Sequence, residues 1–221
     1  MKYTHLLAIA TAATTVAMAS ADTTNLTFNG VLAGSNVTIT SPGYNGAIDA
    51  GSMLINLAGS TGASSGYVGN YIAYCVDLYQ FVNAGPNEYT FASLDTVTAG
   101  DPMGAVAAAD LANLYGYAAG AQYVADNDYA TAFQLAVWEI IYDSGGTFDA
   151  SAGNFTASGM NAGTTIILAD LLANFGSNSN GPAQLIGLTH PEWQDMVIEV
   201  PGPGALALIG LAGLFGRRTR R

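Results

Sequence analysis

The chain has 221 residues, of which 16 are acidic and 5 are basic, and half are hydrophobic. Every basic residue lies near an end of the chain, whereas every Asp and Glu lies between Asp22 and Glu199, which excludes nucleic acid and anionic membrane surfaces as partners of this middle part. One cysteine is present, so no intramolecular disulfide can form, and apolar burial and hydrogen bonds have to hold the domain.

Residues 1–21 predict a secretory signal peptide. A basic residue precedes an apolar stretch at 6–18, and Ala19 and Ala21 occupy the small-residue positions of a signal peptidase site. The stretch contains several threonines and is shorter than the roughly 20 apolar residues of a spanning helix. We therefore expect cleavage after Ala21, which leaves an exported acidic domain at 22–199.

The first half of this domain predicts antiparallel strands. Short runs rich in Val, Ile, Leu, Phe and Thr alternate with Gly, Ser, Pro and Asn. Three such runs are 25–29, 35–40 and 53–57. A longer strand is expected at 67–82, and it is expected to form a hairpin with 88–92.

The second half predicts helices and then two final strands. We expect a helix at 103–119, with Asp101 as its N-cap and Pro102 in its first turn. Two more helices are expected at 128–142 and 164–175. The final strands are expected at 184–188 and 196–200. The sum is an α+β fold, an antiparallel β-sandwich or barrel with inserted helices, flanked by the signal helix and a short apolar C-terminal helix.

The tail at 200–221 has three parts in a fixed order. The first part is Val200-Pro201-Gly202-Pro203, the second is the apolar run 205–215, and the third consists of Arg217, Arg218, Arg220 and Arg221. This order resembles the PEP-CTERM sorting signal of Gram-negative bacteria that make extracellular polysaccharide, with Gly202 in place of the family's glutamate. The resemblance implies sorting to the cell envelope or to the outside of the cell by an exosortase-type processing enzyme.

The tail also has the physical properties of a transient inner-membrane anchor. As a helix, residues 201–216 reach about 24 Å, which is short of a hydrocarbon core of about 30 Å. The arginines are expected to stay on the cytoplasmic side until the tail is cut. The alternative is a plain membrane anchor that is never cleaved.

Cys75 lies in the predicted strand 67–82, where successive side chains alternate between faces. The apolar face, expected to point into the core, consists of Ile72, Tyr74, Val76 and Leu78. Cys75 therefore shares the opposite face with Asp77. A carboxylate there is expected to be solvated, although it is also placed to polarise chemistry at the sulfur.

Gln134 lies in the middle of the apolar stripe of the predicted helix 128–142. The stripe consists of Ala130, Val137, Trp138 and Ile141, whereas Ala132, Glu139 and Asp143 lie on the opposite side of the helix. A buried carboxamide without a hydrogen-bond partner costs about 1–3 kcal/mol, so a partner is expected. Taken separately, Gln134 is a core amide bonded to backbone and Cys75 is a small buried hydrophobe. Taken together, they suggest an internal thioester, formed when the sulfur displaces ammonia from the carboxamide.

Two short segments carry a second resemblance. Tyr74-Cys75-Val76-Asp77 and Phe133-Gln134-Leu135-Ala136-Val137-Trp138 are similar to segments of the thioester domains of bacterial surface adhesins. The resemblance implies a cross-link between Cys75 and Gln134, with Tyr74, Asp77 and Trp138 around it. It also implies covalent attachment to an amine or hydroxyl, so surface amines and exopolysaccharide are the expected partners.

The absence of lysine from the acidic domain agrees with a stored thioester, since no side-chain amine is available to attack it. A salt-adapted secreted protein explains the same composition. His190 is the sole histidine of the domain, which excludes catalytic triads and histidine zinc sites. We expect an adhesion module rather than an enzyme, with no cofactor and no metal. The alternative is a non-covalent structural or carbohydrate-contacting matrix protein that exposes Tyr71, Tyr79 and Tyr89.

Overall fold

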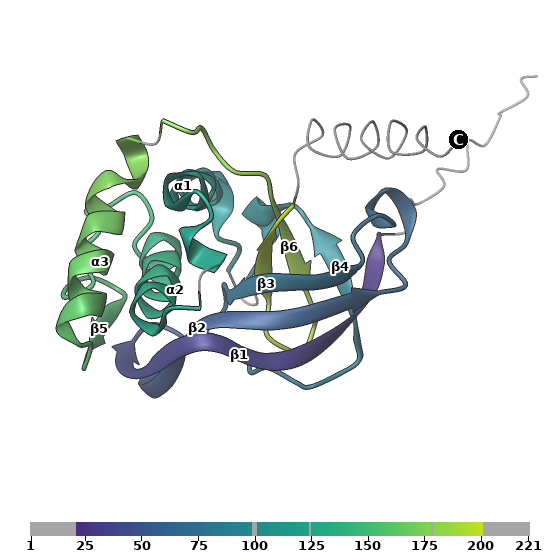
Figure 1. Ribbon diagram of the computed structural model, residues 1–221, viewed down its shortest axis with the longest axis horizontal. Helices are drawn as coiled ribbons and strands as arrows, with labels where there is room; N and C mark the ends of the chain where they lie inside the picture. The colour runs from purple at the N-terminus through teal and green to yellow at the C-terminus, as the bar shows by residue number, and fades with distance from the viewer. Residues whose placement is uncertain (1–20, 99–100, 124, 178, 201–221) are drawn as a thin grey trace, which may run out of the picture.

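The computed structural model describes residues 21–98, 101–123, 125–177 and 179–200. Within these residues, an antiparallel sheet of seven strands and three α-helices form a mixed fold, in which the helices gather at one end of the sheet (Figure 1). The predicted combination of an antiparallel sheet with inserted helices is confirmed at this level. The signal peptide before Ala21 and the tail after Val200 lie outside the described residues, together with Ala19, Pro201, Gly202, Pro203 and the four arginines.

The strands are β1 (Thr23–Thr40), β2 (Asn45–Ala58), β3 (Gly69–Cys75), β4 (Asn87–Ala92), β5 (Thr156–Ser158), β6 (Leu185–Thr189) and β7 (Met196–Glu199). The α-helices are α1 (Gly104–Ala118), α2 (Asn127–Tyr142) and α3 (Ala162–Asn174). The strand order is β2-β3-β7-β6-β4-β1-β5, and β1 also pairs with β2. Six of these strands therefore pair in a closed ring, and β5 adds to the far end of β1.

The first two strands form one long hairpin. The runs expected at 25–29 and 35–40 belong to the single strand β1, because β-bulges absorb the break between them. One bulge lies between Phe28 and Gly30, and Gly30 has a φ of 118°, which favours glycine. The hairpin turns at Ser41, whose backbone N–H donates to the Tyr44 carbonyl at 2.8 Å.

The predicted long strand at 67–82 and its hairpin with 88–92 are wrong. Strand β3 ends at Cys75, and β4 pairs with β1 and β6 instead of β3. Beyond Cys75 the backbone is no longer free to extend a ladder. The Leu78 N–H donates to the Tyr142 hydroxyl at 3.0 Å, and the Tyr79 N–H donates to Asp77 Oδ1 at 2.6 Å. The chain turns at this point as a result.

The helices begin close to their predicted positions, but two caps differ. Helix α2 begins after Asp126, whose carboxylate accepts from the Tyr129 N–H at 2.8 Å. Helix α1 begins at Gly104 with Met103 rather than Asp101 at its N-cap. Helix α3 begins two residues earlier than expected, because the Asn161 side chain accepts from the Thr164 N–H at 2.8 Å.

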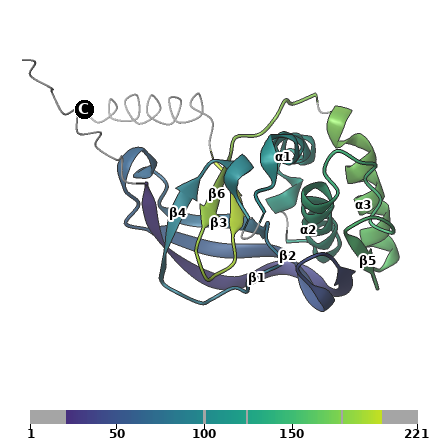
Figure 2. The same ribbon diagram turned by 180° about the vertical axis from the view of Figure 1, so that it is seen from behind.

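Helix α2 is buried on every side, because it lies between the sheet and α3 (Figures 1 and 2). All twelve residues from 130 to 141 are buried. The sequence placed Ala132 and Glu139 opposite the apolar stripe, and both are nevertheless fully buried. The prediction of an amphipathic helix with one solvated face is therefore wrong for α2, which forms the centre of the core.

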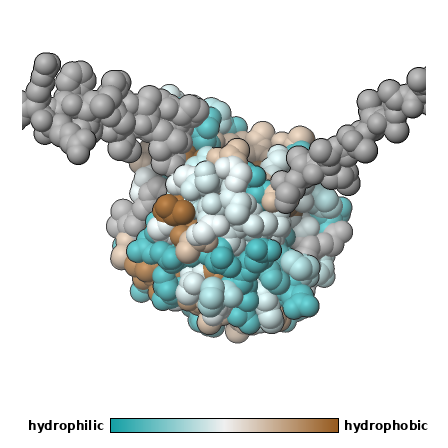
Figure 3. Space-filling model, turned by 90° about the vertical axis from the view of Figure 1, so that its right-hand side faces the viewer, coloured by the Kyte–Doolittle hydropathy of each residue, from teal (hydrophilic) through white to brown (hydrophobic). Residues whose placement is uncertain are grey.

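The end of the sheet that faces away from the helices is largely hydrophilic or neutral, with apolar colour confined to small separate spots (Figure 3). No helix in the described part of the chain combines the length and apolar character needed to cross a bilayer. At the C-terminal edge of this part, the Val200 N–H donates to the Gln184 carbonyl at 2.9 Å, which holds the chain against β6 until the tail begins.

Candidate functional site

The structure places Cys75 and Gln134 side by side. The Cys75 backbone N–H donates to Gln134 Oε1 at 2.9 Å, and Gln134 Nε2 donates to the Cys75 carbonyl at 2.8 Å. Both residues are buried. The expectation that Gln134 is a core amide bonded to backbone is therefore correct, and the backbone in question is that of the sole cysteine.

Two elements hold this pair in register. Cys75 is the last residue of β3, and Gln134 lies on α2. The start of α2 is tied to the β1–β2 hairpin by two hydrogen bonds. Thr131 Oγ1 donates to the Ala50 carbonyl at 3.2 Å, and the Gly34 N–H donates to Asn127 Oδ1 at 3.1 Å. The position of the Gln134 carboxamide is thus fixed by its two hydrogen bonds to the Cys75 backbone and by the bonds that hold the start of α2 on the β1–β2 hairpin.

The Cys75 sulfur lies in a dry and acidic environment. Its thiol donates to the Asp77 carbonyl at 2.9 Å. Burial raises the pKa of the Cys75 thiol to about 12, the Asp77 backbone and the Trp138 side chain oppose this rise, and the carboxylates of Asp77 and Asp195 add to it. The thiol is protonated at neutral pH, so any reaction of the sulfur has to include removal of its proton.

Asp77 is not the solvated carboxylate that the sequence predicts. Its side chain is 0% exposed, and Gln194 Nε2 donates to its main-chain carbonyl. Asp195 is also buried, and it accepts from the His190 backbone N–H at 2.9 Å. Burial, with the nearby charge of Asp77, raises the pKa of Asp195 to about 6 although two backbone N–H groups oppose the rise. No Lys or Arg lies among the described residues to neutralise this pair.

Gln194 and Asp195 also belong to the site, although no sequence pattern predicts them there. They lie immediately before β7, about 120 residues after Cys75. The pairing of β3 with β7 brings them together, since Cys75 pairs with Met196 and the Val76 N–H donates to the Asp195 carbonyl at 3.1 Å. Such a long-range pairing leaves no local pattern in the sequence.

The two aromatic residues predicted around the thioester differ in position. Tyr74 points into the core away from Cys75. Its ring packs against Phe133 at a tilt of 52°, with the centroids 4.7 Å apart, and its hydroxyl donates to the Gln122 carbonyl at 2.7 Å. Trp138 lies on the Gln134 side, where its ring packs near Phe155 with centroids 6.2 Å apart. Trp138 therefore belongs to the site, whereas Tyr74 supports the strand from behind.

A cavity of about 310 Å³ reaches the pair from the surface. Cys75, Gln134 and Trp138 form its inner part together with Gln194. Its remaining walls are mainly apolar and consist of Phe28, Val31, Ile48, Met53, Phe81 and Val82, with Asp49 and Gly51. Val31 is 55% exposed and Phe81 is 67% exposed, so the mouth of the cavity opens to solvent beside these two side chains.

No family model, curated protein or solved structure matches this chain. The chemistry open to Cys75 and Gln134 therefore has to be deduced from their surroundings. Three features define those surroundings: a carboxamide held against the cysteine backbone, a protonated thiol beside it, and an apolar passage to solvent.

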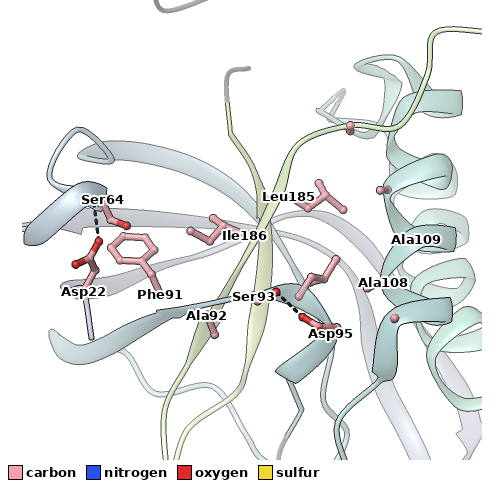
Figure 4. Close-up of a pocket in the computed structure, with 14 residues that line it drawn as sticks. Asp22, Ser64, Phe91, Ala92, Ser93, Asp95, Ala108, Ala109, Leu185 and Ile186 are labelled. Atoms are coloured by element: carbon pink, nitrogen blue, oxygen red, sulfur yellow. Dashed lines mark hydrogen bonds between the residues drawn. The ribbon is translucent and has the colours of Figure 1, made fainter. Parts of the chain in front are cut away.

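A larger hollow of about 650 Å³ lies elsewhere, between α1 and the strands β4 and β6 (Figure 4). Its two carboxylates are already engaged. Asp22 Oδ2 accepts from the Ser64 N–H at 2.9 Å, and Asp95 accepts from the Ser93 hydroxyl. The rest of its lining is mainly alanine and aliphatic side chains. This hollow offers no nucleophile comparable with Cys75.

Two further observations bear on the alternatives. Among the described residues, no group of three His, Cys, Asp or Glu side chains is arranged to hold a metal ion. Of the three tyrosines expected at the surface, Tyr79 is exposed and Tyr71 is half-buried, whereas Tyr89 is fully buried and donates its hydroxyl to the Gln194 carbonyl at 3.2 Å. The expectation of an exposed Tyr89 is wrong, because its side chain lies on the buried face of β4.

Proposed function

We propose that this protein is an exported surface module that stores an internal thioester between Cys75 Sγ and the side-chain carbonyl carbon of Gln134. The observation that carries the proposal is the pair of hydrogen bonds, 2.9 and 2.8 Å long, that hold the carboxamide on the Cys75 backbone. They bring the sole sulfur nucleophile and the amide into one buried site.

The same contacts favour the reaction. The Cys75 N–H donates to Oε1 and polarises the carbonyl, and it is placed to stabilise the oxyanion that forms when sulfur attacks. The S–H bond breaks, a C–S bond forms, and the C–N bond then breaks. Ammonia leaves with the hydrogen that the thiol gave up, so atoms and charges balance.

The apolar passage gives a partner nucleophile a route to the stored acyl group. An amine or hydroxyl attacks the carbonyl carbon, the C–S bond breaks, and the Cys75 thiol is regenerated while Gln134 becomes an amide or ester with the partner. The uniformly acidic domain attracts cationic amines toward the site. The domain itself has no lysine, which protects the stored bond from its own side chains.

The ends of the chain extend this proposal to export and sorting. Signal peptidase removes residues 1–21, the inner membrane holds the C-terminal helix for a time, and an exosortase-type enzyme processes the tail at 200–221. The working domain at 22–199 is then delivered to the envelope or the polysaccharide matrix. The ring of six paired strands favours the barrel over the sandwich as its architecture.

Intact mass of the exported protein tests the proposal. The protein is expected to weigh less than its processed sequence by one ammonia, and methylamine is expected to add to Gln134 and free the thiol. Cys75→Ala and Gln134→Ala should each remove the mass deficit. Gln80→Ala is a control, since Gln80 is a half-buried glutamine that bonds the His190 carbonyl. A full sequence mass with a freely alkylated Cys75 contradicts the proposal.

A non-covalent matrix protein is the second candidate, favoured by the exposed Tyr79 and Phe81 close together on the surface. Retention at the cell surface separates the two candidates. Under the thioester proposal, Cys75→Ala abolishes covalent retention that survives boiling in detergent. Under the second candidate, Cys75→Ala leaves retention unchanged and Tyr79→Ala reduces it.

A further inference from the structure

The indole N–H of Trp138 is a buried donor that the thioester proposal leaves unexplained. Trp138 is 1% exposed, and its Nε1 has no hydrogen-bond acceptor in bonding geometry among the described residues. A buried tryptophan N–H normally has a partner. The absence of one beside a reactive pair suggests that the acceptor arises only during the reaction.

The Trp138 side chain lines the same cavity as Cys75. It follows Gln134 by four residues on α2, so the two side chains lie on the same face of the helix. Both line the cavity that reaches Cys75. The Trp138 side chain is also among the groups that lower the pKa of the Cys75 thiol, which agrees with an indole close to the sulfur.

The other groups near the sulfur are less suited to this role. The carboxylates of Asp77 and Asp195 oppose negative charge on Cys75. The Tyr142 hydroxyl accepts from the Leu78 N–H at 3.0 Å, and Tyr142 does not belong to the lining of the cavity that Cys75 and Trp138 share. Each of the two nearby amides already uses one side-chain N–H to hold a backbone carbonyl. Gln134 Nε2 donates to the Cys75 carbonyl, and Gln194 Nε2 donates to the Asp77 carbonyl.

We propose that Trp138 is a catalytic hydrogen-bond donor, whose indole N–H stabilises the negative charge that develops on the Cys75 sulfur. This inference rests on the proposed thioester function. In thioester formation the charge appears when the thiol loses its proton before attack, and that proton leaves with ammonia. In thioester opening the charge appears when the C–S bond breaks, and the sulfur then takes a proton from the attacking amine. A donor fixed in a buried site stabilises charge without having to reorient.

The first test replaces the donor and keeps an aromatic ring. Trp138→Phe in the full exported protein is expected to slow methylamine opening, followed by intact mass, by about 10- to 1000-fold. Trp193→Phe is the matched control, because Trp193 is the other tryptophan of the chain and lies outside the cavity lining. Equal opening rates in Trp138→Phe and Trp193→Phe overturn the inference.

A second variant guards against a folding defect. Trp193→Phe leaves Trp138 as the sole tryptophan, so biosynthetic replacement with benzothienylalanine changes this position alone. The analogue keeps the size of the indole and has sulfur in place of the N–H. A folded protein that opens at least about tenfold more slowly supports the donor role. A rate within twofold of the parent shows that Trp138 acts by packing, and overturns it.

A third measurement separates failure of the donor role from failure of the thioester proposal. In the Gln134→Ala background no thioester can form, so the thiol is available to iodoacetamide. Adding Trp138→Phe is expected to lower the alkylation rate at a fixed pH, because less thiolate is present. If the parent protein has its full sequence mass and Trp138→Phe still lowers the alkylation rate, the thioester proposal alone is wrong. If Trp138→Phe leaves the alkylation rate unchanged or increases it, the donor role of Trp138 is wrong.

Discussion

Helix α2 buries an amide and a carboxyl group on opposite faces, and the two differ in how many hydrogen-bond partners they have. Gln134 faces the sheet, and both ends of its carboxamide are engaged by the Cys75 backbone. Glu139 is equally buried, but only Oε1 has a partner, the Asp149 backbone N–H at 2.6 Å. Its Oε2 has no hydrogen-bond partner among the described residues.

The difference follows from the chemistry of the two groups, because Gln134 is neutral whereas Glu139 is ionisable. A neutral amide can bond one backbone N–H and one carbonyl without carrying a charge, so Gln134 fixes α2 to the end of β3 at any pH. The buried Glu139 carboxylate has no Lys or Arg among the described residues to pair with. Burial raises the pKa of Glu139 to about 7, and Asp143 and Asp149 add to the effect of burial although the Asp149 N–H opposes it. The Glu139 side of the helix is therefore expected to respond to pH.

Removing the amide is expected to have the largest effect on stability. Gln134→Ala leaves the N–H and the carbonyl of Cys75 without their partners and opens a small cavity, so the free energy of unfolding should fall by about 3 kcal/mol. Urea unfolding under conditions that keep the thioester open measures this loss. Gln80→Ala should cost less than about 1 kcal/mol, because it removes one bond at a half-buried site. Similar losses in the two variants would show that the Cys75–Gln134 contact is not special.

Replacing the carboxyl is expected to have a smaller effect of opposite sign. In the folded protein the pKa of Glu139 is about 7, above its ordinary value of 4.5, so the folded state retains a proton that the unfolded state loses. Its contribution to stability is complete below about pH 4.5 and is lost as the pH rises to about 7. Glu139→Gln mimics the protonated form and should stabilise the protein at pH 8 by about 2 kcal/mol.

Unfolding in urea at several pH values tests this prediction. The variant should lose the part of the pH dependence that lies between about pH 4.5 and 7. A slope at lower pH should remain, because Asp195, with its pKa raised to about 6, contributes in the same direction. A variant that is less stable than the parent at pH 8 would mean that the Glu139 carboxylate is satisfied by a group yet to be identified.

The sequence was sufficient to predict the burial of Gln134 but not that of Glu139. Helical periodicity placed Gln134 on a buried face, which is a local property of α2. The same periodicity placed Glu139 on the opposite face, where solvent was expected. The packing of α3 over that face is a tertiary event, so local pattern could not predict the burial of this carboxyl.

The strand that carries Cys75 shows the same limit. The predicted strand extends from 67 to 82, whereas the observed strand β3 ends at Cys75. The Asp77 side chain and the Tyr142 hydroxyl accept from the backbone N–H groups of Tyr79 and Leu78, respectively, and these two groups take no part in a ladder. Tyr142 comes from the end of α2, so this termination depends on the fold. The antiparallel character of the sheet was predictable from short apolar runs, but the insertion of β7 between β3 and β6 was not.

The cap of α2 offers the smallest effect and the cleanest test of whether the Gln134 contact depends on helix stability. Asp126→Ala removes the acceptor of the Tyr129 N–H and should cost about 1 kcal/mol of unfolding free energy. Asp126→Asn keeps an acceptor and should be nearly neutral. Gln134 lies two turns further along the helix and is held by the Cys75 backbone, so neither variant should change the mass deficit or the methylamine opening rate. If Asp126→Ala abolished the mass deficit while the protein stayed folded, the first turn of α2 would determine whether the thioester forms. The contact between Gln134 and the Cys75 backbone would then not be sufficient to explain the reaction.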